Sequence, residues 1–505
     1  MKRSLFCLGL LGSVVLAFAQ WEPEVLLHRQ GDRLGWFYEK VEGLGDWTGD
    51  EIDDFAVLSY TSGFDTSVLD IWWGAASLSP DPDTTVCFPD SIACFQLRNT
   101  GDITGDGIPD LLTGGAVPGS WRSYICLYRG GRAQIELVQM LRVDATAVAV
   151  PGDISGDGIP DMIVGDANWN NSRGRLMVYL GTPTGFVGPV DSLEGTQPSF
   201  GLLGSNLTAG ADMDADGWGD FSCVFNGYDT TVALFHPRPG DYFGDYDLFH
   251  AWWGGFVPQA YQSGLPVLVL PCINPHGYCV YLGGDGLDTI PDAALPIDSL
   301  LGGTPTYAGD VNADGLGDWV AGSDRAYGGL GAFMLFLGGP WISNYYQWHG
   351  GFNGYWGEGK HMNGLGDVNG DGVDDFAMLC SNDTTGHEGS QLVVFAGNEE
   401  WHVAVDDKRP APVRMPVTIH AYPNPTNSEV RIEVLGMSRG QAVVEVWNIL
   451  GQRVWQQEVS ISTDSANFIW GTRDMAGHSV AAGIYFIQVI QRGISLARHK
   501  ILVTQ

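Results

Sequence analysis

A ten-residue acidic pattern recurs six times along the chain, and this repeat constrains the fold more than any other feature. The copies begin at Gly45, Gly101, Gly152, Ala211, Gly309 and Gly366. Counted from the Asp that follows, each copy has an oxygen-bearing side chain at positions one, three, five and nine. An apolar, strand-like segment follows each copy. Such repetition indicates an array of similar units rather than a set of unrelated domains.

The spacing of these side-chain oxygens suits a hard divalent cation. Ca²⁺ takes about six to eight oxygen ligands, and a tight loop with an oxygen at every second residue directs them inward, joined by a backbone carbonyl at position seven. Glycine at position four or six permits the positive-φ turn that such a loop requires. Mg²⁺ demands a stricter octahedron, and turn-forming Asp-Gly pairs alone would not recur in register. We predict up to six calcium ions, with these ligands: Asp46, Thr48, Asp50, Ile52, Asp54; Asp102, Thr104, Asp106, Ile108, Asp110; Asp153, Ser155, Asp157, Ile159, Asp161; Asp212, Asp214, Asp216, Trp218, Asp220; Asp310, Asn312, Asp314, Leu316, Asp318; Asp367, Asn369, Asp371, Val373, Asp375.

The first loop, with Glu51 at position six in place of glycine, is the weakest of these predicted sites.

The distances between copies predict seven units rather than six. The first ligands are separated by 56, 51, 59, 98 and 57 residues, so the fourth interval holds an extra unit near Ala260 that lacks the acidic loop. Units of ~50 residues with several short strands are typical of a β-propeller. We therefore predict an all-β fold with a seven-bladed propeller over residues 20–403. Residues 21–28 are expected to close the last blade beside Val393, and a linear solenoid is the competing architecture.

Charge and the N-terminal segment limit the partners and the location. The 59 acidic against 25 basic residues give a net charge of −34, which argues against nucleic acid as a partner. Residues 1–19 are predicted to be a signal peptide, with a basic start, an apolar run and Ala17-Phe18-Ala19 before the cleavage point. No later stretch approaches the ~20 apolar residues of a transmembrane helix, so we expect an exported chain without a transmembrane segment.

The cysteines fit an oxidising compartment. Cys87 and Cys94, and likewise Cys272 and Cys279, have a seven-residue separation that suits small disulfide loops, although spacing does not prove connectivity. The remaining cysteines of the mature chain follow strand-like patterns and are expected to be buried thiols: Cys126, Cys223 and Cys380.

The acidic loop followed by an apolar strand resembles the FG-GAP repeat of the integrin α-subunit propeller, which also occurs in many bacterial secreted proteins. The resemblance covers about residues 21–400. It implies a propeller that binds calcium and that leaves the face opposite the metal loops for recognition. It does not imply a particular ligand.

The C-terminal part differs from the repeats in composition and polarity pattern. Residues 404–417 are charged and proline-rich, which predicts a linker. Residues 418–505 alternate in polarity as in a small β-sandwich. This part resembles the type A sorting domain of the type IX secretion system, which implies export through outer-membrane secretion machinery to the cell surface or the medium. An ordinary carbohydrate-binding sandwich is the alternative. The resemblance rests on Tyr422-Pro423-Asn424-Pro425, Asn448-Ile449-Leu450-Gly451-Gln452-Arg453-Val454, Trp470-Gly471-Thr472-Arg473-Asp474, Gly483-Ile484-Tyr485-Phe486 and His499-Lys500-Ile501.

The sequence offers no recognisable catalytic group. The eleven histidines are scattered outside the common catalytic motifs. We therefore predict a binding or adhesion module for a protein or glycan ligand. A secreted polysaccharide- or glycan-degrading enzyme and a purely structural surface component are the alternatives, and convergent His, Tyr, Arg or Glu side chains on one propeller face would favour the enzyme. Two aromatic stretches, residues 242–256 and 345–356, are expected to pack between blades, with sugar stacking as the alternative.

Overall fold

The structure is a computed structural model. It describes residues 23–401 and 418–504 except for 31–35, 62–66, 89–92, 118–122, 132–134, 197–200, 227–230, 252–253, 261–263, 265, 273–276, 285–286, 288, 290, 297–303, 324–331, 340–344, 350–360, 381–389, 423–425, 427, 436–439, 449–452, 462–464, 476 and 492–493. The predicted signal peptide and the predicted linker, residues 404–417, lie outside these described ranges.

The described strands between Val25 and Phe395 form seven four-stranded antiparallel sheets, and each sheet is a blade. One four-residue helical turn, α1 (Trp169–Ser172), lies between two strands of the third blade. Blade by blade, the strands are β2 (Trp36–Gly45), β3 (Asp54–Thr61), β4 (Ser67–Trp72), β5 (Thr84–Cys87); β6 (Ala93–Gly101), β7 (Asp110–Ala116), β8 (Ser123–Arg129), β9 (Glu136–Arg142); β10 (Ala147–Gly152), β11 (Asp161–Gly165), β12 (Arg175–Thr182), β13 (Gly185–Glu194); β14 (Ser205–Ala211), β15 (Asp220–Asn226), β16 (Thr231–Phe235), β17 (Tyr246–His250); β18 (Gly255–Val257), β19 (Val267–Cys272), β20 (Gly277–Leu282), β21 (Ala293–Pro296); β22 (Thr306–Gly309), β23 (Asp318–Ser323), β24 (Ala332–Phe336), β25 (Tyr345–His349); and β26 (His361–Gly366), β27 (Asp375–Cys380), β28 (Gln391–Phe395) with β1 (Val25–Gln30).

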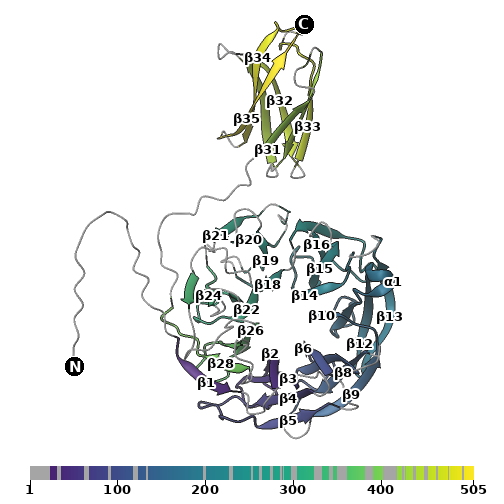
Figure 1. The fold of residues 1–505 in the computed structure, drawn as a ribbon, viewed down its shortest axis with the longest axis vertical. Helices are drawn as coiled ribbons and strands as arrows, with labels where there is room; N and C mark the ends of the chain where they lie inside the picture. The colour runs from purple at the N-terminus through teal and green to yellow at the C-terminus, as the bar shows by residue number, and fades with distance from the viewer. Residues whose placement is uncertain are drawn as a thin grey trace, which may run out of the picture.

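The blades form a closed ring (Figure 1). The first strand of each blade contacts the first strand of the next, and the series returns from β26 to β2. The strand β1 closes the ring by pairing with β28, where His28 lies opposite Val393, and the prediction that residues 21–28 complete the last blade beside Val393 is confirmed for β1. Closure gives every blade two neighbours, so no end blade is left exposed as in a linear array. The all-β propeller prediction is confirmed, and the solenoid alternative is excluded.

Each acidic loop connects the first and second strands of its blade. The Asp at position nine is the first residue of the second strand in all six loops, as in Asp54 of β3. The blade formed by β18–β21 lacks an acidic loop, and β19 contains the apolar segment that the sequence assigns to the seventh unit. The sequence therefore correctly places a blade in the double-length interval.

Apolar side chains from neighbouring blades form the core. One buried cluster combines Leu58 and Leu69 with Leu97 and Leu111 of the next blade. Burial of such side chains stabilises the ring by about 1.5–3 kcal/mol each relative to exposure. The side chains thus hold successive blades together around the ring.

Most described aromatic side chains of the first aromatic stretch pack inside the protein, although Tyr246 is 40% exposed. Phe243 lies edge-on against Phe221 and Phe235, with ring centroids 6.5 and 6.0 Å apart. Phe249 makes a similar contact with Tyr281 of the next blade at 4.8 Å. These contacts support the packing interpretation. The side chains of residues 345–349 and the whole of residues 350–356 lie outside the described part.

The C-terminal domain consists of two packed sheets. One contains β29 (Thr418–Tyr422), β30 (Val430–Leu435) and β33 (Ser465–Trp470), and the other contains β31 (Gly440–Asn448), β32 (Arg453–Ile461), β34 (Gly483–Gln491) and β35 (Ile494–Val503). Val430 and Trp470 of the first sheet share a buried core with Val444 and Ile487 of the second. This arrangement is the predicted small β-sandwich.

The cysteines only partly follow the predicted pairs. Cys279 is disulfide-bonded, whereas Cys87 and Cys94 are free thiols. The suggested loop between Cys87 and Cys94 is wrong because Cys87 is exposed on the outer strand of one blade and Cys94 is buried on the inner strand of the next. The expected buried thiols, Cys126, Cys223 and Cys380, are confirmed.

Among the described helices, none has the length and apolarity to cross a membrane.

Candidate metal loops and a central pocket

The six acidic loops share one backbone framework, fixed by the Asp at position one. In the second loop, the backbone N–H groups of Gly105 and Asp106 donate to Asp102 Oδ1 at 2.6 and 3.1 Å, and that of Gly107 donates to Oδ2 at 2.8 Å. In every loop the N–H of position six donates to the first Asp. The side chain and the backbone thus fold each loop around one carboxylate.

Positions four and six have positive φ in every loop. The sequence assigns this conformation to glycine, and glycine occupies position six in five loops. Glu51 adopts φ 68° at position six of the first loop, and Ala215 and Ala313 adopt 61° and 54° at position four. Non-glycine residues are strained in this region, so Glu51 keeps the common loop geometry at a conformational cost, and the weakness of the first site as a metal site stays a prediction.

The Asp at position nine is buried and held by backbone donors. Asp318 accepts hydrogen bonds from Val311 N at 2.9 Å and from Gly338 N at 2.6 Å, and its side chain has no exposure. Burial raises the pKa of Asp318 to about 8, and in the same way the pKa of Asp54 and of Asp375 to about 7. A charged carboxylate in such a place is stabilised by a nearby cation.

Side chains and backbone also join neighbouring loops. Asp53 precedes the ninth-position Asp of the first loop, and its Oδ2 accepts the N–H of Asp367 in the sixth loop at 3.1 Å. Asp374 likewise accepts the N–H of Asp310 in the fifth loop at 2.8 Å. The fifth, sixth and first loops therefore form one connected edge of the propeller.

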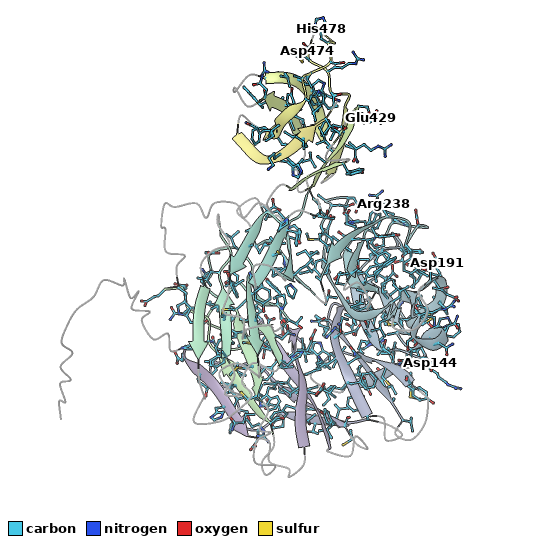
Figure 2. The ribbon with its side chains drawn as sticks, turned by 45° about the horizontal axis from the view of Figure 1, so that its top comes forward. Asp144, Asp191, Arg238, Glu429, Asp474 and His478 are labelled. Atoms are coloured by element: carbon cyan, nitrogen blue, oxygen red, sulfur yellow. The ribbon has the colours of Figure 1, made fainter. Side chains whose placement is uncertain are left out.

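The fourth loop differs from the others in its side chains. Within the described part of the chain, only this loop brings three acidic side chains within 4.8 Å of one another: Asp212, Asp214 and Asp216. His236 Nδ1 lies 3.1 Å from Asp220 Oδ1, and Arg238 Nε lies 2.6 Å from Asp216 Oδ2. Burial alone lowers the pKa of His236, but Asp220 and Asp247 raise it to about 10. Arg238 projects from the edge of the ring (Figure 2).

Sequence reasoning missed His236 although a signal was present. In the other five loops, a glycine at or just beyond the end of the third strand donates its N–H to the ninth-position Asp, as Gly181 does to Asp161 at 2.8 Å. In the fourth blade the strand register puts Pro237, which has no N–H, in that place, and His236 one residue earlier, opposite Asp220. Alignment of the third strands, in addition to the loops, would have singled it out.

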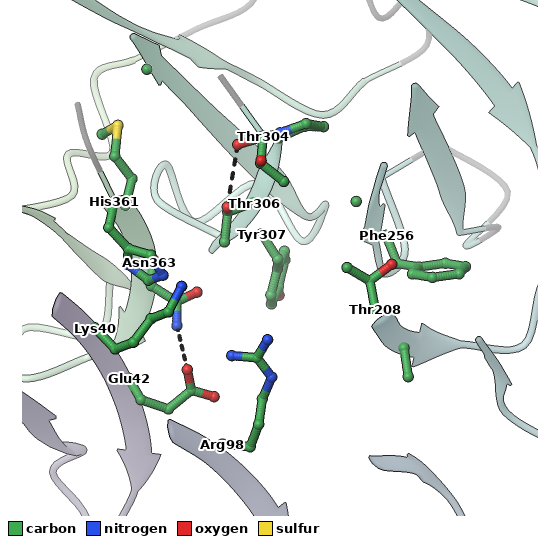
Figure 3. Close-up of a pocket in the computed structure, with 15 residues that line it drawn as sticks. Lys40, Glu42, Arg98, Thr208, Phe256, Thr304, Thr306, Tyr307, His361 and Asn363 are labelled. Carbon is green, nitrogen blue, oxygen red and sulfur yellow. Dashed lines mark hydrogen bonds between the residues drawn. The ribbon is translucent and has the colours of Figure 1, made fainter. Parts of the chain in front are cut away.

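The inner strands surround a pocket of about 400 Å³. Figure 3 shows Lys40, Glu42 and Arg98 beside it, with Tyr307 and His361. These residues come from β2, β6, β22 and β26, which are far apart in the sequence and adjacent only in the closed ring. The pocket thus brings together Arg, Glu, Tyr and His side chains, the combination that would favour the enzyme alternative.

Glu42 is fixed in the pocket by neutral donors and flanked by cations. Its carboxylate accepts Asn99 N at 3.1 Å and Asn363 Nδ2 at 2.9 Å. Burial raises the pKa of Glu42, and the opposing effect of Arg98 only partly offsets this. The positive charges of Lys40 and Arg98 create a locally basic site in a strongly acidic protein.

The C-terminal domain matches a known family. Residues 420–504 match the secretion system C-terminal sorting domain. The chain is therefore exported across the outer membrane, to the cell surface or the medium, through the type IX secretion machinery.

The propeller is similar to parts of integrin α-subunits, which confirms the FG-GAP resemblance. Integrin α-7 of Homo sapiens is 30% identical over 156 residues, covering 27% of this chain and 12% of the integrin. Integrin α-V of Gallus gallus is 29% identical over 222 residues, covering 39% of this chain and 20% of the integrin. The chain thus spans a small fraction of the length of these relatives.

Two solved structures are similar at low identity. PorZ, described as an essential bacterial surface component of the type-IX secretion system of Porphyromonas gingivalis, shares 12% identity at a TM-score of 0.31, covering 90% of this chain and 68% of PorZ. A rhamnogalacturonan lyase of Bacillus licheniformis shares 11% identity at a TM-score of 0.39, covering 73% of this chain and 75% of the lyase. These likenesses concern the fold alone.

Proposed function

We propose that this exported chain is a calcium-stabilised surface binding module whose central pocket holds an acidic glycan. The observation that carries the proposal is the repeated loop. Each of the six loops pairs a buried, rigid Asp at position nine with three further oxygen-bearing side chains at positions one, three and five.

Calcium suits these loops because of their donor set. Side-chain oxygens at alternate positions and a carbonyl at position seven fit a hard cation with a high coordination number. The fixed position-nine Asp, held by backbone N–H groups, keeps one carboxylate in place before the ion arrives. Since Ca²⁺ would bind only the folded loops, it would stabilise the propeller by mass action.

The pocket suits an acidic sugar because of its charge and its aromatic ring. Arg98 and Lys40 offer hydrogen-bond donors for a carboxylate, and the Arg guanidinium can form two parallel hydrogen bonds with its two oxygens. Tyr307, which is 37% exposed, lines the same pocket and offers a face for a sugar ring. A uronate-containing glycan combines both features.

Retention of the full chain on a glycan array, with and without chelator, tests this proposal. We expect uronate-containing glycans to be retained with calcium present, and Arg98→Ala to remove this retention. Arg142→Ala, on the exposed outer strand β9, is the matched control and should bind as the wild type does. Equal retention of neutral glycans, or unchanged binding by Arg98→Ala, would contradict the proposed ligand.

A second candidate function is a polysaccharide lyase, favoured by the convergence of Glu42, Tyr307 and His361 with Arg98 in one pocket. A lyase removes the proton beside the sugar carboxylate and then expels the neighbouring oxygen-linked sugar, which requires a base and cations that stabilise the carboxylate. Incubation with a uronate polymer distinguishes the two functions. Unsaturated, ultraviolet-absorbing products would support the lyase, whereas binding without product supports the binding module.

A further inference from the structure

We propose that His236 converts the fourth acidic loop into a mixed nitrogen–oxygen metal site that takes a transition-metal ion of the Zn²⁺ class in place of Ca²⁺. The inference rests on the same loop as one part of the proposed calcium function and concerns which metal that loop selects. The other five loops keep their oxygen-only donor sets.

The ligand atoms already face one another. Nδ1 of His236 lies 3.1 Å from Asp220 Oδ1 and 3.8 Å from Asp214 Oδ2, and atoms of these three residues all lie within 4.8 Å of each other. The side chains of His236 and Asp220 are only 4% and 1% exposed.

Two of these buried atoms lack a hydrogen-bond partner. Neither His236 Nδ1 nor Asp220 Oδ1 makes a hydrogen bond, although they are close together. Buried polar atoms are nearly always paired, so an unpaired couple requires an explanation. A metal ion shared between the ring nitrogen and the carboxylate oxygen would satisfy both atoms.

The far side of the imidazole is arranged as in a metal-bound histidine. His236 Nε2 lies 3.4 Å from Oδ2 of Asp247, which is on the adjacent strand β17. Histidine ligands commonly direct their second ring nitrogen to a carboxylate, which orients the ring and increases its basicity. Asp247 is therefore a positioning residue for the proposed ligand.

The remaining acids favour a transition metal over calcium. Arg238 Nε contacts Asp216 Oδ2 at 2.6 Å, while Asp216 Oδ1 accepts the N–H of Trp218 at 3.0 Å. Arg238 Nη2 also lies 3.2 Å from Asp214 Oδ2. The Trp218 contact recurs in every loop. Arg238, however, competes with a bound ion for Asp216 Oδ2 and Asp214 Oδ2, and Ca²⁺ takes about six to eight oxygens. An imidazole with two carboxylates suits Zn²⁺, and Asp214 and Asp220 keep their Oδ1 atoms for the ion.

Metal binding by the full chain tests the inference. The protein is first treated with chelator, then saturated with Ca²⁺, and Zn²⁺ or Co²⁺ is titrated in. We expect the wild type to retain one more equivalent of Zn²⁺ than His236→Asn, and to give a visible Co²⁺ absorption band that the variant lacks. The variant's remaining Zn²⁺ affinity should fall by more than about 10-fold, since loss of even an outer partner costs about 10–100-fold.

Three variants control the experiment. His478→Asn changes an exposed histidine of the C-terminal domain and should bind Zn²⁺ as the wild type does. His236→Leu introduces the residue found at the equivalent place beside the third and fifth loops, Leu180 and Leu337, and it replaces His236→Asn if that variant fails to fold. Asp247→Asn should weaken Zn²⁺ binding by about 10-fold or more without abolishing the site.

The outcomes separate this inference from the calcium proposal. Equal Zn²⁺ binding by the wild type and the folded His236 variants, or no Zn²⁺ binding by the wild type, would overturn the mixed site and leave an imidazolium paired with the carboxylates. A calcium-dependent rise in melting temperature that persists in His236→Asn would show that the calcium loops act independently. Loss of the calcium effect with Zn²⁺ binding intact would overturn the calcium proposal alone.

Discussion

The third and fourth acidic loops have the same backbone conformation but different side chains around the ninth-position Asp. In both, the N–H of position two donates to the ninth-position Asp, from Ile154 to Asp161 at 3.0 Å and from Met213 to Asp220 at 2.6 Å. The other oxygen of Asp161 accepts the N–H of Gly181, whereas that of Asp220 faces the imidazole of His236.

This difference shows how a repeat can change function at one position. The loop, its positive-φ residues and its buried Asp provide a common frame. At the end of the third strand, Gly181 gives the buried Asp of the third loop a backbone donor, whereas the fourth blade has Pro237 in that place, which has no N–H, and His236 next to it, a possible metal ligand. The blades without that histidine remain the reference against which the fourth loop is judged.

The largest expected effect comes from removing the buried Asp of the third loop. Asp161→Ala leaves the N–H groups of Ile154 and Gly181 without an acceptor, and each unsatisfied buried donor costs about 1–3 kcal/mol. We expect a loss of about 3 kcal/mol in the free energy of unfolding, measured with denaturant in the presence of chelator. Asp157→Asn, at an exposed loop position, should lose calcium affinity with little change in that assay. Equal losses for both variants would contradict the structural role of Asp161.

A smaller effect is expected at the glycine that distinguishes the two loops. A Cβ at Gly181 would lie 2.1 Å from the carbonyl oxygen of Pro160. Gly181→Ala should therefore cost about 1–3 kcal/mol through overpacking, measured as the shift in denaturant midpoint. Gly471→Ala, where a Cβ meets open space, serves as the control. A Gly181→Ala protein as stable as the wild type would mean that the frame is looser than the structure indicates.

The smallest effect is expected in the first loop, where Glu51 is held at φ 68°. Glu51→Gly should remove strain of about 1–2 kcal/mol, partly offset by the greater flexibility of glycine in the unfolded chain. We expect a net gain of about 0.5–1 kcal/mol in the free energy of unfolding and tighter calcium binding by this loop. A loss of stability would indicate that the Glu51 side chain makes a contribution larger than its backbone strain.

The repeat made most of the propeller predictable from sequence. The repeat predicted the strands that follow each loop, the blade that lacks a loop, and the completion of the last blade by residues 21–28 beside Val393. These features depend on local patterns and on one periodicity. The free thiols of Cys87 and Cys94 were not predicted, since spacing does not show that a blade boundary separates them.

The sites that depend on ring closure were less predictable. Glu42, Arg98 and His361 meet in one pocket only because β2, β6 and β26 are adjacent inside the ring. His236 meets Asp220 and Asp247 because three strands of one blade end together. No periodic pattern in the sequence indicates such contacts between side chains of different strands. The sequence therefore predicted the acidic loops but not the central pocket or the position of His236 beside the fourth loop.

Calcium-dependent thermal unfolding of the full chain tests the central claim most directly. Each occupied loop should add about 2.7 kcal/mol at a free calcium concentration 100-fold above its dissociation constant. We therefore expect the melting temperature of the propeller to rise by at least about 5 °C from chelator to millimolar Ca²⁺. The same melting temperature in chelator and in calcium would show that the acidic loops are not calcium sites.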